Sequence, residues 1–137
     1  MTTNLLQIAD EKFWDHIHKR HQDKGGVYKM IAVRNEQRVP INRFLGTDNE
    51  GVLYIGKATS YVDRVIELKK SIAADYKGTG HICGRRYKSN PKIAKQFPYE
   101  HLFVELIQTD KPEEKEKELL EAYFITYGEV PPLNAIL

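Results

Sequence analysis

Three short runs rich in β-branched and aromatic residues set the main limit on how this chain can fold. They are GVYKMIAV (26–33), VLYIG (52–56) and YEHLFVELI (99–107), and their composition predicts β-strands. The segment between the first two runs is short and contains no clear helix, so these two strands are expected to pair antiparallel as a hairpin. The hairpin loop, from about residue 34 to residue 51, is longer than most loops in compact domains, which favours a functional role.

Helical patterns fill most of the remaining chain. They cover residues 3–22, 60–74, 90–97 and 110–128. Ser60, Asn90 and Asp110 are typical amino-terminal caps, and Gly128 is a typical helix stop. The expected fold class is α/β in the broad sense (α+β). It has a small three-stranded antiparallel sheet flanked by helices and an extra amino-terminal helix. The stretch containing Gly78, Gly80 and Gly84 is expected to be irregular.

Length and composition favour one globular domain. The chain has 137 residues, of which 41% are hydrophobic and 29% charged. We expect residues 1–24 to form an amino-terminal helical extension and residues 25–137 to form the domain proper. The single cysteine, Cys83, favours a reducing compartment. No apolar run approaches a membrane span and the first residues lack the pattern of a secretion signal, so the expected location is cytoplasmic.

The charge is unevenly distributed along the chain, although the net charge is only +2. Residues 57–95 carry ten Lys or Arg against three acidic residues, and residues 110–129 carry seven acidic residues against three lysines. Two solvated faces of opposite sign would explain this distribution. A phosphate-facing surface in the middle of the chain would explain it as well.

Five features combine residue types that could carry out chemistry. They are Tyr28 in GVY, Tyr54 in YIG with Lys57 after it, Arg64 ten residues beyond Tyr54, Glu121 in LLEA, and Asn134 in PPLN. Taken singly, each has an ordinary structural explanation, since strand tyrosines usually pack and helix charges usually face water. Glu121 stands among apolar residues, which makes a buried or cleft-facing carboxylate more plausible there than at Glu113 or Glu116.

Taken together and in this order, the five features resemble the GIY-YIG nuclease superfamily over residues 25–134. The resemblance implies a three-stranded antiparallel sheet flanked by helices and a divalent-metal-dependent endonuclease that cuts DNA. It makes Tyr28 and Tyr54 the two motif tyrosines and Arg64 the helix arginine. Glu121 becomes the metal-binding glutamate and Asn134 the terminal asparagine.

The chemistry explains these residue types. Mg²⁺ or Mn²⁺ keeps most of its waters, so Glu121 can suffice as the sole protein ligand. Arg64 can bracket two phosphate oxygens. We hypothesise that Tyr28 is the base that deprotonates the attacking water and that Tyr54 orients water or phosphate. Lys57, Arg64 and the metal are expected to lower the pKa of the base.

The pattern departs from the family in two places. Tyr28 and Tyr54 are 26 residues apart, so the inserted loop is expected to offer Arg34, Arg38 and Arg43 to DNA. Leu68 stands where restriction-type members have a histidine, and His81 is the candidate replacement. Further expected phosphate contacts are Lys69, Arg85, Arg86 and Lys88, with Tyr87 available for stacking on bases.

Three functions follow from the sequence. The leading one is a Mg²⁺-dependent DNA endonuclease, with RNA left open as a substrate. The second is a non-catalytic nucleic-acid-binding module that retains the fold. The third is an interaction protein whose acidic last helix docks a partner. Either the basic stretch and the hairpin loop bind DNA themselves, or targeting is expected to come from a homodimer, formed through the amino-terminal helix, or from a partner protein.

Overall fold

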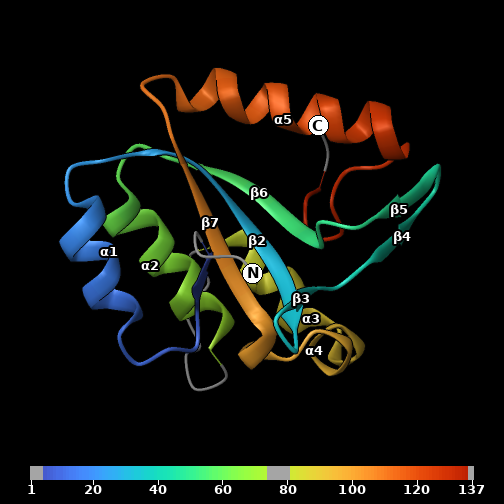
Figure 1. The fold of residues 1–137 in the computed structure, drawn as a ribbon, viewed down its shortest axis with the longest axis horizontal. Helices are drawn as coiled ribbons and strands as arrows, with labels where there is room; N and C mark the ends of the chain where they lie inside the picture. Colours follow the sequence, from blue (N-terminus) through green and yellow to red (C-terminus); the bar gives the residue numbers. More distant parts are fainter. Residues whose placement is uncertain (1–4, 74–80, 136–137) are drawn as a thin grey trace.

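The computed structural model describes residues 5–73 and 81–135, which form a five-stranded antiparallel sheet, a separate two-stranded sheet and several helices (Figure 1). The elements are β1 (Leu5–Gln7), α1 (Phe13–His21), β2 (Gly26–Arg34), β3 (Gln37–Arg38), β4 (Ile41–Arg43), β5 (Gly46–Asp48), β6 (Val52–Ala58), α2 (Tyr61–Ile72), α3 (Ile82–Ser89), α4 (Pro91–Gln96), the 3₁₀ turn η1 (Tyr99–His101), β7 (Leu102–Gln108) and α5 (Pro112–Tyr127). Thr3, Ala74, Gly78 and Gly80, which the sequence predictions include, lie outside the described residues. Within the described residues, none of the helices combines the length and the apolar character that crossing a membrane requires.

The main sheet has five strands, so the expected count of three is wrong. β2 is the central strand and pairs antiparallel with β7 on one side and β6 on the other. β1 adds to the far edge of β7, and the two-residue β3 pairs with the end of β2. The three predicted strands are confirmed as β2, β6 and β7. The two extra strands have two or three residues each, which is too short for a periodic sequence signal.

The two faces of the sheet carry separate cores because side chains alternate along β2. Tyr28, Met30 and Ala32 point toward the helices α1, α2 and α3. Val27, Ile31 and Val33 point toward α5, whose Leu120 and Tyr123 complete the second core. Figure 1 shows α5 on one side of the sheet and α1 and α2 on another.

The amino-terminal segment does not form the single helix predicted for residues 3–22. It begins with β1, and α1 starts only at Phe13. The edge of β7 is available to pair with a short apolar strand, and this pairing prevails over helical periodicity at Leu5 and Leu6. Ile8, Phe13 and Ile17 are fully buried in the same core as Tyr28. The described part of the extension therefore belongs to the main core.

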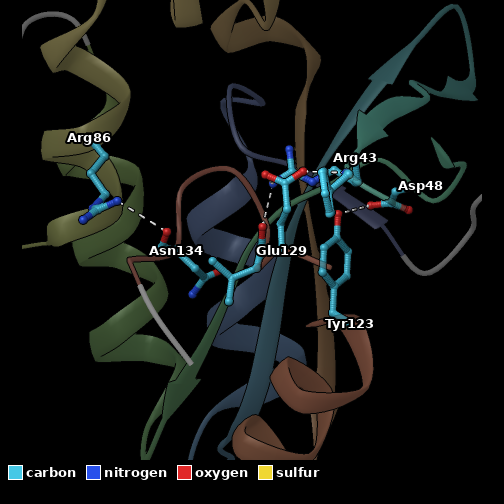
Figure 2. Close-up of polar contacts among 8 residues, drawn as sticks. Arg43, Asp48, Arg86, Tyr123, Glu129 and Asn134 are labelled. Carbon is cyan, nitrogen blue, oxygen red and sulfur yellow. Dashed lines mark hydrogen bonds and ion pairs between the residues drawn. The ribbon is translucent and has the colours of Figure 1, made fainter. Parts of the chain in front are cut away.

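The long connection between β2 and β6 is ordered secondary structure and not an open loop. Its central part is the β4–β5 hairpin, which reaches the carboxyl end of α5 (Figure 1). Asp48, only 1% exposed, ends the hairpin. Its carboxylate accepts hydrogen bonds from the Tyr123 hydroxyl (2.9 Å) and from the backbone N–H groups of Glu50 and Val52 (Figure 2). These contacts fix the insertion against α5.

The predicted irregular stretch contains a helix, α3, in its described part. Gly84, one of the three glycines behind that prediction, is inside α3 and faces Ser71 of α2. A Cβ atom at residue 84 would lie 2.0 Å from Ser71 Oγ. This glycine therefore permits close helix packing and does not mark a loop. The other helix predictions hold to within a turn, and Asn90 caps α4 as expected by accepting from the Lys92 N–H (3.0 Å).

Candidate active site

The two motif tyrosines are neighbours on paired strands. Tyr28 of β2 lies opposite Gly56 of β6, and Tyr54 lies opposite Met30, so both phenol rings are on the α2 side of the sheet. Their ring centroids are 6.1 Å apart. A Cβ atom at Gly56 would approach the Tyr28 hydroxyl to 2.6 Å. The glycine of YIG is therefore needed to make room for the Tyr28 ring.

His81 joins this pair from the amino terminus of α3. Its Nε2 lies 2.6 Å from the Tyr28 hydroxyl oxygen, and its Nδ1 accepts a hydrogen bond from the Cys83 backbone N–H at 3.1 Å. Burial, followed by the charge of Arg64, lowers the pKa of His81 to about 4, so the ring is neutral at pH 7. A neutral ring that accepts at Nδ1 carries its proton on Nε2. His81 therefore donates to the Tyr28 oxygen.

Arg64 in the first turn of α2 supplies the positive charge of the cluster. Its guanidinium acts electrostatically on both Tyr28 and Tyr54 and bonds Glu67 at 2.8 Å. Burial nevertheless raises the pKa of Tyr54 to about 12, and burial together with the neighbouring Tyr54 raises that of Tyr28 well above its usual value. Arg64 lowers both pKa values as expected, but the net shift in the free protein is upward, because removal from water outweighs the attraction of Arg64.

Lys57 does not lie with the tyrosines. Because side chains alternate along β6, it points away from the face that carries Tyr54, and its ammonium lies 3.8 Å from Glu113 of α5. Both residues line a hollow of about 570 Å³ beside the end of β6, which Arg64 also lines. Lys57 thus contributes charge to the rim of this hollow.

Glu121 is exposed, so of the two alternatives predicted at this position, a buried or a cleft-facing carboxylate, the first is wrong and the second agrees with the structure. It belongs to α5, which packs on the face opposite Tyr28, and it lines a second hollow of about 280 Å³ that Lys57 and Glu113 also line. Glu116, one turn before the buried Leu120, lines the same hollow and is half-buried. Its charge acts on Tyr54, which makes it a carboxylate that sequence reasoning missed.

The environment of Glu116 explains its difference from Glu121. Burial first, and then the nearby Glu113, raise the pKa of Glu116, while Lys57 and Arg64 oppose this shift. A heptad-like reading of α5 from its buried residue Leu120 backwards would have placed residue 116 on the inward side of the helix. The apolar residues next to Glu121 in the sequence suggested that this residue faces the core, whereas the side of α5 that packs on the sheet carries Glu116.

Asn134 completes the far edge of β6 (Figure 2). Its side-chain oxygen accepts from the Ile55 N–H and its amide donates to the Ile55 carbonyl, both at 2.9 Å. The Leu133 N–H also donates to the Leu53 carbonyl at 2.8 Å. Asn134 therefore holds the strand that carries Tyr54, next to the tyrosine itself.

Several cations predicted to contact phosphate are engaged within the protein. Arg43 pairs with Glu129 (3.3 Å) and donates to the Val130 carbonyl (2.7 Å), as Figure 2 shows in part. Lys69 donates to the Ile8 carbonyl and to the Tyr99 hydroxyl, and Arg86 donates to the Asn134 carbonyl. The remaining engaged cations are Arg34, which donates to the Gln96 carbonyl, and Arg38, which pairs with Glu105.

Two of the predicted basic contacts, Arg85 and Lys88, are exposed on α3. Tyr87 between them is buried, and its hydroxyl donates to the Phe97 carbonyl at 2.6 Å. The prediction that Tyr87 stacks on bases is therefore wrong.

The described residues contain no cluster of three or more His, Cys, Asp or Glu side chains that could enclose a metal ion. A hydrated Mg²⁺ needs only one or two carboxylates, so the half-buried Glu116 and the exposed Glu121 fit such an ion chemically. Comparisons with protein-family models, with curated proteins and with solved structures found nothing that matches this chain.

Proposed function

We propose that this protein is a divalent-metal-dependent endonuclease of the GIY-YIG type that hydrolyses phosphodiester bonds in DNA. The observation that carries this proposal is the convergence of Tyr28, Tyr54, His81 and Arg64. The Tyr28 oxygen lies 2.6 Å from His81 Nε2, and the Tyr54 and His81 ring centroids are 5.5 Å apart. These residues come from four different elements, and packing alone does not require a neutral histidine, two phenols and a guanidinium at one point.

The sheet supports the same proposal. Its three long strands run in the order β7, β2, β6 and are all antiparallel, with Tyr28 on the central strand and Tyr54 on its neighbour. The motif resemblance implies a three-stranded antiparallel sheet flanked by helices, and these three antiparallel strands support the proposal to that extent. In this proposal β1, β3 and the β4–β5 hairpin are additions to that layout.

Tyr28 serves as the base in the proposed reaction, for which its phenol must first release its proton to water, because burial keeps its pKa well above the usual value in the free protein. Its oxygen receives the His81 Nε2–H and faces the positive charge of Arg64, and both interactions favour the phenolate over the phenol. His81 cannot take the proton at Nε2 while it carries its own proton there, so it stabilises the base and does not replace it. Tyr54, beside Tyr28, is left to orient the water or the phosphate.

Arg64 has to change partner in this reaction. It bonds Glu67 in the free protein and would exchange this carboxylate for the non-bridging oxygens of the phosphate. The positive charge of the guanidinium then stabilises the negative charge that develops on the phosphate in the transition state. When bound, Mg²⁺ or Mn²⁺ supplies further positive charge at the scissile phosphate.

Two carboxylates of α5 are the proposed holders of the metal. Glu121 is the residue that the motif selects, whereas the charge of Glu116 acts on Tyr54 and Arg64. Both residues belong to α5, on the sheet face opposite the tyrosines, so the carboxylate whose charge reaches Tyr54 and Arg64 is the better placed to bring the ion to the same phosphate. We therefore assign the principal role to Glu116 and a supporting role to Glu121, because both line the same hollow.

A second candidate function, nucleic-acid binding without cleavage, is favoured by the burial of the tyrosines. Tyr28 is 0% exposed and Tyr54 is 8% exposed, so cleavage requires the substrate to open a path to them. A module that only binds would need no such opening. It would use the exposed basic side chains of α3 and α4, such as Arg85, Lys92 and Lys95.

Cleavage of supercoiled plasmid DNA with Mg²⁺ or Mn²⁺ tests the proposal. We expect cleavage by the wild type and none in EDTA. The Tyr28→Phe variant should lose about 10²- to 10⁴-fold in rate, because the base is gone while the ring still packs. Tyr127→Phe, which removes a hydroxyl on α5, is the matched control and should cleave at the wild-type rate.

The metal assignment is tested with Glu116→Gln and Glu121→Gln. Mn²⁺ binding measured by calorimetry should weaken more in Glu116→Gln, and the cleavage rate should fall in the same order. The reverse order would return the principal role to Glu121. A wild type that shifts DNA in a gel but never cuts it, with either metal, would contradict the nuclease and support the binding module.

A further inference from the structure

An apolar patch lies on the surface where the β4–β5 hairpin meets the carboxyl end of α5. Its residues, called the hairpin patch below, are Phe44 (79% exposed), Leu45 (61%), Phe124 (42%) and Ile125 (76%). These are four of the five large hydrophobic side chains that are exposed in the described residues, and the fifth is Ile82 on α3. Such a concentration at one place calls for an explanation, whereas single exposed apolar residues do not.

Phe44, Leu45 and Phe124 are brought together at Gly128, and Ile125 follows Phe124 in α5. A Cβ atom at Gly128 would lie 2.9 Å from Leu45 Cγ and 3.1 Å from Phe44 Cδ2, so the hairpin tip occupies the place of a side chain at residue 128. Phe124 lies one helical turn before this residue, and the Gly128 N–H donates to its carbonyl. Phe44 and Leu45 therefore continue the exposed apolar surface of the last turn of α5.

The hairpin tip is held in this exposed position by polar contacts. The Leu45 N–H donates to the Tyr127 carbonyl at 2.9 Å, and the Phe44 N–H donates to a Glu129 carboxylate oxygen at 2.7 Å. Glu129 also pairs with Arg43, and Figure 2 shows this pair next to the Tyr123–Asp48 bond. A tip fixed in this way is organised for binding before a partner arrives, which lowers the entropy lost on association.

We propose that the hairpin patch is a dimerisation surface that binds a second copy of this chain about a two-fold axis. An isologous contact brings each residue near its own copy or its symmetric counterpart, so a patch with a net charge would repel itself. Here Arg43 and Glu129 neutralise each other at the base of the tip. The same pairing argues against a nucleic acid as the occupant, because it leaves the patch without an available guanidinium from Arg43.

The size of the patch agrees with a dimer of moderate affinity. The four side chains expose roughly 400–500 Å² per protomer. Two copies would remove about 1,000 Å² from water, which is at the lower limit of specific interfaces. The amino-terminal helix, which the sequence suggested for dimerisation, is less suitable, because Phe13 and Ile17 of α1 are fully buried in the core of their own protomer.

Sedimentation velocity of the full chain over a concentration series tests the dimer. We expect a species of twice the chain mass that dissociates on dilution. The Phe44→Ser/Ile125→Ser variant should weaken self-association at least about 10-fold, because large apolar side chains dominate interface energy. Ile82→Ser, at the exposed apolar side chain outside the patch, is the matched control and should remain dimeric.

A second variant tests the dimer in case the double variant does not fold. Leu45→Lys adds a charge to the fixed tip without removing a buried group and should also give a monomer by like-charge repulsion across the axis, with an unchanged thermal transition. A wild type that is monomeric throughout would overturn the proposal, as would equal loss of the dimer in Ile82→Ser. A monomer whose affinity for duplex DNA falls in Phe44→Ser/Ile125→Ser would overturn it in favour of a nucleic-acid wedge.

Discussion

The two ring nitrogens of His81 have different hydrogen-bond partners, the Cys83 N–H and the Tyr28 hydroxyl. The Cys83 N–H requires an acceptor at Nδ1, and the Tyr28 hydroxyl lies within hydrogen-bond distance of Nε2. Because a neutral imidazole has only one proton, the backbone contact determines that Nε2 donates. Full burial keeps the ring neutral, and the cost of burying a charged ring then couples folding to pH.

Stability should therefore fall with acid through His81. The folded pKa of about 4 is below the ordinary 6.5, so between these values the unfolded chain binds a proton that the folded chain does not. The contribution is complete above pH 6.5 and is lost as the pH falls to about 4, by about 3 kcal/mol across the window. Urea unfolding at pH 7.0, 5.5 and 4.5 measures this loss.

Glutamine at residue 81 isolates the effect, since it cannot titrate. We expect His81→Gln to flatten the dependence of unfolding free energy on pH by that amount, and the exposed-residue variant His18→Gln to leave it unchanged. An identical slope in the wild type and in His81→Gln would mean that the buried ring is not the group responsible.

Residue identities along the chain predicted part of this site. Tyr28, Tyr54 and Arg64 were recognisable because they occur in order within GVY, within YIG and ten residues after Tyr54, despite the long gap between the tyrosines, and the structure brings them together. His81 was named only as a candidate, and its partner could not be inferred from position 81. Glu116 was passed over because inward and outward positions on a highly charged helix such as α5 depend on what the helix packs against.

At the scale of elements, the contact between α2 and α3 depends on a missing side chain. A Cβ atom at Gly84 would approach Ser71 Oγ to 2.0 Å, Ser71 Cβ to 2.3 Å and the Ser71 carbonyl carbon to 2.7 Å. His81 is the amino-terminal cap residue of α3, so this contact also holds His81 against Tyr28. Close packing on Ser71 requires glycine at residue 84, whereas helix propensity favours alanine there.

The stability of the Gly84→Ala variant shows which of these two effects is larger. Propensity alone predicts that alanine stabilises α3 by about 1 kcal/mol. The clash with α2 predicts a net loss of about 1–3 kcal/mol, which is the effect we expect in thermal or urea unfolding. Adding Ser71→Gly removes two of the three close atoms and should recover part of the loss. A Gly84→Ala protein more stable than the wild type would show that α2 and α3 do not pack this closely.

For the molecule as a whole, the first described residues complete the core. β1 covers the outer edge of β7, and α1 buries Phe13 and Ile17 beside α2. Removing this segment would expose one edge of the sheet and part of the larger core together.

A chain that begins at Asp23 should therefore lose its cooperative unfolding transition in calorimetry and circular dichroism. The single variant Ile17→Ala is the reference, because it empties one core site at a cost of about 2–5 kcal/mol while the transition stays cooperative. If the shortened chain unfolded cooperatively near the wild-type temperature, residues 1–22 would be a dispensable extension, as the sequence suggested.

Local periodicity, together with the Asn90 cap, was enough to predict several elements of the fold. These are the strands β2, β6 and β7, the helices α2, α4 and α5, and the tyrosine and arginine positions in them. Tertiary structure alone decided the features that depend on neighbours distant in the chain. It recruited Leu5–Gln7 to an open strand edge, allowed α3 to form around Gly84, and placed the β4–β5 hairpin on α5. It also turned Glu116 inward and joined His81 to Tyr28. Burial and long-range hydrogen bonds decide these outcomes. A short segment forms neither until the rest of the chain packs against it, so its own sequence does not predict them.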